Sequence, residues 1–86
     1  MEINDIYNQI KKIIISILEI DIAETEIDDD EILFGGGLGI PSITSLKIIV
    51  EIEKYFNIEF DDDEDLSYEN INRISSLGNY VYKKLH

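Results

Sequence analysis

The chain has 86 residues, which is enough for one domain, residues 1–86, and too few for a second hydrophobic core. The formal net charge is −12, from 19 acidic and 7 basic side chains. A surface this negative repels phosphate backbones and anionic lipids, so we expect no nucleic-acid and no membrane partner, and we expect protein partners with positive surfaces. There is no cysteine, which excludes disulfides and thiolate metal ligands.

No part of the sequence predicts export or membrane insertion. The first residues, Met1 to Asp5, lack the basic start and the apolar core of a secretory signal. The apolar run Ile13-Ile14-Ile15 is far shorter than the ~20 residues that cross a bilayer. We expect a monomeric protein in the cytoplasm.

Residues 3–18 are predicted to form an amphipathic helix. Apolar side chains recur there at the spacing of one helix face: Ile3, Ile6, Tyr7, Ile10, Ile13, Ile14, Ile17 and Leu18. The opposite face is predicted to meet water and carries Asn4, Asn8, Lys11 and Lys12.

Two segments hold most of the acidic residues. Eight acids lie from Glu19 to Glu31, and six lie from Glu59 to Asp65. Such runs are typical of solvated loop faces, and residues 24–31 are predicted to form an acidic loop after the first helix. Asp28–Glu31 and Asp61–Asp65 lack the alternating ligands, central glycine and final glutamate of an EF-hand loop, so no dedicated metal site is expected.

A glycine-rich loop precedes the second helix. Ile32-Leu33-Phe34 is a short apolar anchor, and Gly35-Gly36-Gly37-Leu38-Gly39 has too many glycines for a helix interior. Pro41 closes this loop, and proline is favoured in the first turn of a helix.

The second helix is predicted from Ser42 to Phe56. It is apolar on most of its circumference, at Ile43, Leu46, Ile48, Ile49, Val50, Ile52, Tyr55 and Phe56. This helix is therefore either the centre of a bundle or an element that keeps one face for partners.

Two further helices complete the predicted fold. A short one is expected over Leu66–Asn72. The last is capped by Ser75 or Ser76, has Leu77, Tyr80, Val81 and Leu85 on its inner face, and has Lys83 and Lys84 near its negative end. The predicted fold class is all-α: a four-helix bundle of three main helices and one short helix, with a long loop after the first.

The sequence offers no catalytic constellation. His86 is the only histidine and lies at the chain end, so a Ser-His-Asp triad is not expected. Ser42 lacks the second glycine of a G-x-S-x-G elbow, and no Lys-Ser or Lys-Thr pair follows the glycines as in a P-loop. We therefore expect no enzymatic activity. From the residues alone, Ser42 is best explained as a helix cap, although Ser45 prevents a capping box.

The stretch Leu38-Gly39-Ile40-Pro41-Ser42-Ile43-Thr44-Ser45-Leu46, running on to Ile52–Ile58, resembles the attachment region of acyl and peptidyl carrier proteins. In that family the pattern is Gly, an apolar residue, Asp, Ser, then Leu or Ile. Phe34-Gly35-Gly36 and Ile74-Ser75-Ser76-Leu77 extend the resemblance over nearly the whole chain. It implies that Ser42 receives a covalent 4′-phosphopantetheine from coenzyme A through a phosphopantetheinyl transferase. The thiol of that arm then holds an acyl or aminoacyl group as a thioester.

The chain departs from the family pattern in two ways. Pro41 stands where the family has Asp, and the charges of Lys47, Glu51, Glu53 and Lys54 cancel where carriers of bacterial fatty-acid synthesis have an acidic helix. The second departure makes the chain similar to stand-alone carriers of polyketide or nonribosomal-peptide type.

The resemblance also implies which partners and contact residues to expect. The partners are the transferase, an acyl- or aminoacyl-loading enzyme and downstream synthase or tailoring enzymes. The residues predicted to meet them are Pro41, Ile43, Leu46 and Lys47, although Ile43 and Leu46 could instead belong to the core. The alternatives are an unmodified helical adaptor that binds proteins through its apolar second helix, and a carrier that has lost its arm because of Pro41.

Overall fold

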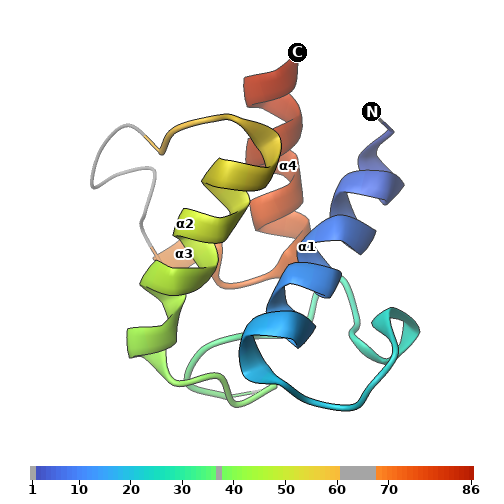
Figure 1. The fold of residues 1–86 in the computed structure, drawn as a ribbon, viewed down its shortest axis with the longest axis vertical. Coiled ribbons are helices and arrows are strands. Elements are labelled where there is room, and N and C mark those ends of the chain that lie inside the picture. The colour runs from blue at the N-terminus through green and yellow to red at the C-terminus, as the bar shows by residue number, and fades with distance from the viewer. Residues whose placement is uncertain (1, 37, 61–67) are drawn as a thin grey trace.

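The computed structural model describes residues 2–36, 38–60 and 68–86, with the backbone alone at Ser42, Tyr68 and Glu69. Its elements are helices α1 (Ile3–Leu18), α2 (Ser45–Phe56), α3 (Tyr68–Ile71) and α4 (Ile74–Leu85), with 3-10 turns at Glu24–Glu26 and Ser42–Thr44. Figure 1 shows a long connection between α1 and α2. The predicted all-α bundle, with three main helices and one short one, is confirmed.

Helix α1 lies at the centre of the packing, because it contacts both α2 and α4. Ile6, Ile10 and Ile14 follow one another four residues apart on one face of α1 and are fully buried, as the apolar spacing predicts. The other helices and the connection supply the remaining buried apolar side chains: Ile27, Leu33, Phe34, Ile40, Ile48, Ile49, Ile52, Phe56, Ile74, Leu77 and Val81.

Helices α1 and α4 approach each other closely at Gly78. A Cβ atom at this position would overlap the ring of Tyr7, so only glycine leaves room for the tyrosine. The Tyr7 hydroxyl crosses the contact and donates to the Asn79 Oδ1 at 3.0 Å. Desolvation raises the pKa of this hydroxyl, and the nearby carboxylates of Asp29 and Asp30 raise it further.

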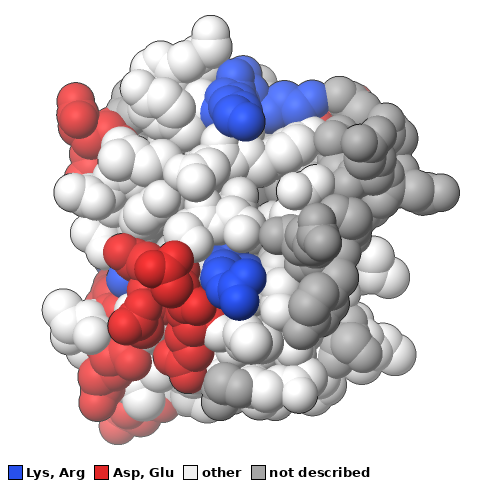
Figure 2. All heavy atoms as spheres, turned by 180° about the vertical axis from the view of Figure 1, so that it is seen from behind, with Lys and Arg blue, Asp and Glu red and all other residues white. Residues whose placement is uncertain are grey.

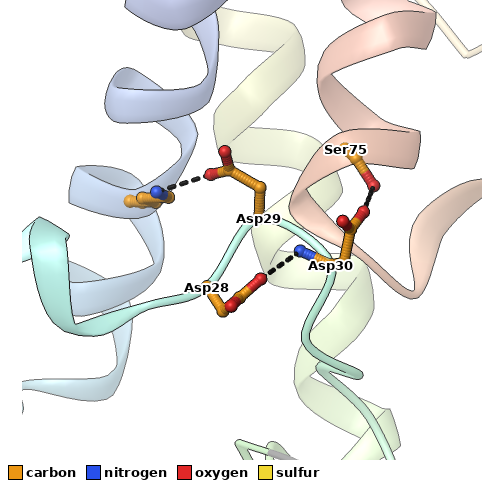
Figure 3. Close-up of polar contacts among 5 residues, drawn as sticks. Asp28, Asp29, Asp30 and Ser75 are labelled. Carbon is orange, nitrogen blue, oxygen red and sulfur yellow. Dashed lines mark hydrogen bonds and ion pairs between the residues drawn. The ribbon is translucent and has the colours of Figure 1, made fainter.

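The prediction that Lys11 faces water is wrong. Its side chain is buried, and its Nζ lies 2.6 Å from the Asp29 Oδ1 (Figure 3). This ion pair joins α1 to the acidic connection. A buried ammonium group needs such a partner, and the helical pattern gives no sign of a partner so far along the chain.

The neighbouring residues join the same connection to α4. The Asp30 carboxylate accepts a hydrogen bond from the Ser75 hydroxyl at 2.8 Å (Figure 3). The Asp29 carbonyl also accepts one from the Ser75 N–H at 2.8 Å. The Arg73 Nε donates to the Asp30 carbonyl at 3.1 Å. The acidic connection is therefore held between two helices at Asp29 and Asp30. The side chain of Asp30 is nevertheless exposed and that of Asp29 is 44% exposed, which agrees with the prediction of a solvated loop.

The predicted cap of α4, Ser75 or Ser76, is wrong. The helix begins at Ile74 with Arg73 at the N-cap position, so neither Ser75 nor Ser76 is the cap. Ser75 instead binds the acidic connection. On the inner face Leu77 and Val81 are buried as predicted, but Leu85 is exposed near the end of the chain. Lys83 and Lys84 lie in the last turn as predicted.

The other acids of the connection give one end of the molecule a negative surface. Glu19, Asp21, Glu26 and Asp28 are exposed there, and Figure 2 shows acidic side chains gathered at the end where this connection lies. The predicted acidic run Asp61–Asp65 lies outside the described residues.

The short helix is partly confirmed, as α3 at Tyr68–Ile71, while Leu66 and Ser67 of its predicted start also lie outside the described residues. Within the described ranges, no helix is both long and apolar enough to cross a membrane.

Replacing Asp29 by Asn tests the buried ion pair. The change leaves the Lys11 ammonium buried without a carboxylate, so we expect the free energy of unfolding to fall by about 1–3 kcal/mol. Asp21→Asn is the matched control, because it removes the same charge from an exposed position of the same connection. Chemical denaturation of both variants measures the difference, and equal stabilities would contradict the structural role of Asp29.

Candidate functional site

The helical segment that begins at Ser42 is the region singled out by the sequence. Ser42 opens a 3-10 turn, Ser42–Thr44, and α2 continues from Ser45. The Thr44 N–H donates to the Pro41 carbonyl at 3.0 Å, which is the i to i+3 bond of a 3-10 turn. The predicted helix from Ser42 to Phe56 is thus present, with a tighter first turn, and Pro41 lies just before it.

The glycine loop folds back so that its two ends lie together. Gly35 and Gly39 adopt φ values of 78° and 76°, a region that favours glycine. The Ile40 N–H donates to the Leu33 carbonyl at 2.9 Å, and Phe34 and Ile40 form a bridge of parallel type. The turns at Gly35 and Gly39 therefore bring Ile40, two residues before Ser42, against the apolar anchor.

The anchor is itself held by Asn72, which lies just before α4. Asn72 is only 1% exposed. Its main-chain oxygen accepts the Leu33 N–H at 2.8 Å, and its side-chain Oδ1 accepts the Phe34 N–H at 3.0 Å. The contacts of Asn72 are not predictable from the sequence, because an asparagine between two helices carries no signal for a partner so distant in sequence.

An apolar ridge on α2 faces solvent next to Ser42. We use the term ridge for Ile43, Leu46 and Val50, which are 84%, 65% and 43% exposed. The opposite side of α2 is buried through Ile48, Ile49, Ile52 and Phe56. The two alternatives left open for this helix are therefore both partly true: one side packs in the core, and the other is an unburied apolar surface. Ile43 and Leu46 are not core residues.

The other residues predicted at this site are accessible as well. Pro41 and Lys47 are both exposed. Val50 was not among the predicted contact residues, although its spacing of four from Leu46 places it on the same face.

Shallow grooves border the ridge on both sides. One lies between α1 and α2, where Lys12, Ser16, Lys47 and Glu51 are among the lining residues. The other is lined by Val50, Glu53, Lys54, Ile58, Glu59 and Phe60. Both grooves contain basic and acidic side chains, and the Lys54 Nζ lies 3.7 Å from the Glu51 Oε1. The ridge is therefore apolar with a nearly neutral border.

The surroundings of Ser42 fit a covalently attached phosphodiester. The neighbouring residues Pro41 and Ile43 are both exposed. The helical segment runs away from Ser42, so the positive end of its dipole favours a phosphate group there. Among the described residues, no three His, Asp or Glu side chains come together as a metal site.

Comparison with known proteins agrees with this geometry. The family model for the phosphopantetheine attachment site matches residues 8–81. No curated protein matches the sequence significantly. The domain of this family carries a covalent 4′-phosphopantetheine, interacts with phosphopantetheinyl transferases and biosynthetic enzymes, and is generally not a catalyst itself. Since the match covers most of the chain, the protein belongs to the phosphopantetheine-attachment family and is a carrier protein.

Proposed function

We propose that Ser42 is the residue that carries the 4′-phosphopantetheine arm, and that residues 1–86 act as one carrier domain. The thiol of the bound arm holds an acyl or aminoacyl group as a thioester, and the carrier presents it to successive enzymes. Neutral charge along α2 favours a carrier of polyketide or nonribosomal-peptide type. Our proposal also places this carrier in the cytoplasm, as a monomer.

The observation that carries this proposal is the position of Ser42. It is the first residue of the helical segment, it follows a glycine loop fixed at both ends, and its neighbours Pro41 and Ile43 are exposed. A transferase must bring coenzyme A to a hydroxyl at such a position, and a serine within the packed core would be out of its reach. Ser45, three residues later, already lies within α2.

The surface beside Ser42 supports a role for α2 in partner binding. Ile43, Leu46 and Val50 present exposed apolar area that α2 does not bury in its own core. We propose that the transferase, the loading enzyme and the downstream enzymes all bind there, with Pro41 and Lys47 at the border. Successive partners must use the same surface because the arm has a fixed point of attachment.

The exposed ridge also favours a second candidate, an adaptor that binds proteins through α2 and carries no group. Pro41 is the residue that keeps this candidate open, because the related carriers have an aspartate at its position. The two functions differ in one measurable property, which is modification at Ser42.

Intact-protein mass after incubation with coenzyme A and a broad-specificity transferase tests the proposal. The parent protein is expected to gain the mass of one phosphopantetheinyl group, and Ser42→Ala is expected to gain none while remaining folded. Ser45→Ala is the matched control and is expected to load like the parent. Loading of Ser42→Ala, or no loading of the parent, would contradict the proposal.

Replacing Pro41 by Asp separates the role of this residue in folding from its role in recognition. The new carboxylate restores the charge that related carriers present to the transferase, so we expect loading to become roughly ten-fold faster, equivalent to ~1.4 kcal/mol. Thermal stability should change little, because the rigidity of proline and the interaction of an acid with the helix dipole are each worth under about 1 kcal/mol.

Two outcomes would contradict the expected effect of Pro41→Asp. Loading rates that are equal within error would show that the carboxylate is dispensable for this carrier. A large loss of stability without a gain in rate would show that Pro41 acts mainly in folding.

A further inference from the structure

We propose that Asn72 is a positioning residue for the modification of Ser42, although it lies 30 residues away in the sequence. The inference rests on the proposed function, because it concerns how the chain holds Ser42 for the transferase. It follows from a continuous series of hydrogen bonds that joins the start of α4 to the residues just before Ser42.

The series begins at Asn72 with two bonds to consecutive residues. The Leu33 N–H and the Phe34 N–H both donate to it, at 2.8 Å and 3.0 Å. Leu33 and Phe34 are buried, so their N–H groups have little access to water and depend on a protein acceptor. Asn72 therefore fixes the position of the anchor relative to α4.

The series then passes from the anchor to the residue before Pro41. The Leu33 carbonyl accepts the Ile40 N–H at 2.9 Å, and the Ile32 carbonyl accepts the Leu38 N–H at 2.9 Å. Ile40 is buried as well, while Pro41 next to it is exposed. Ile40 is thus the last residue before Ser42 that burial and a hydrogen bond to the anchor hold in place. Pro41 has a restricted φ, so the position of Ile40 also limits where the backbone of Ser42 can lie.

Removal of the Asn72 Oδ1 leaves the main-chain bond to Leu33 in place but takes away the acceptor of the Phe34 N–H. Because Phe34 pairs with Ile40, this loss should displace Ser42 while leaving the ridge intact. The ridge residues Ile43, Leu46 and Val50 belong to the segment that packs on α1 through its opposite side. Docking of a transferase on the ridge should persist, but the backbone at Ser42 would no longer have one position relative to the docked enzyme. Loss of orientation lowers kcat, whereas loss of docking raises KM.

The test measures kcat and KM for loading of three variants by one transferase. Asn72→Leu keeps a similar volume but removes the Oδ1 that accepts the Phe34 N–H, and we expect kcat to fall by about ten-fold or more with KM nearly unchanged. Asn72→Asp keeps an oxygen acceptor and is expected to retain most of the parental kcat. Val81→Ala is the control for a loss of stability alone, because it opens a cavity in the core beside α4 and away from the loop. It should leave kcat and KM unchanged.

Circular dichroism establishes that each variant is folded at the assay temperature. If Asn72→Leu is unfolded, Asn72→Ala replaces it with the same expected loss of kcat. A parental kcat for the folded variant, or an equal loss in Val81→Ala, would overturn the inference while the parent still loads on Ser42. Loading of the parent at another residue, or no loading of the parent, would instead overturn the proposed function.

Discussion

Two buried N–H groups, those of Leu33 and Phe34, have their acceptors on Asn72, and the position of the glycine loop depends on these bonds. Glycines alone cannot hold a loop in one conformation, because they have the greatest conformational freedom to lose. Two bonds to a residue next to α4, and a third from Ile40 to Leu33, supply the missing constraint. The segment that contains Ser42 is therefore held at its N-terminal side by hydrogen bonds and at its C-terminal side by the packing of α2.

The charges of the chain are arranged to serve two different purposes. Asp29 and Asp30 join α1 and α4. The carboxylate of Asp29 pairs with Lys11, and the carboxylate of Asp30 accepts a hydrogen bond from Ser75. The Asp30 carbonyl also accepts a bond from Arg73. Around the ridge on α2, positive and negative side chains balance. A partner that binds this ridge gains mainly from apolar contact, while the negative charge elsewhere on the surface favours its approach from a distance if it is basic.

The sequence predicted what depends on short-range patterns. The bounds of α1, the buried row Ile6, Ile10 and Ile14, and the turn before Ser42 all follow from periodicity and from glycine and proline chemistry. It did not predict the burial of Lys11, the bonds of Ser75 or the role of Asn72. Each of these depends on a partner brought close only by the tertiary fold, and a polar residue between helices looks the same whether its partner is water or a distant N–H.

Hydrogen exchange of individual amides, followed by NMR in the parent protein, measures whether hydrogen bonds hold the segment before Ser42 in place. If Asn72 and Leu33 hold the glycine loop, the N–H groups of Phe34 and Ile40 should exchange on the order of 100-fold or more slowly than that of exposed Asp21. Protection of both amides despite their place beside a glycine-rich loop is the predicted result. Exchange of Phe34 and Ile40 at the rate of Asp21 would contradict the account, because the segment before Ser42 would then have no fixed position.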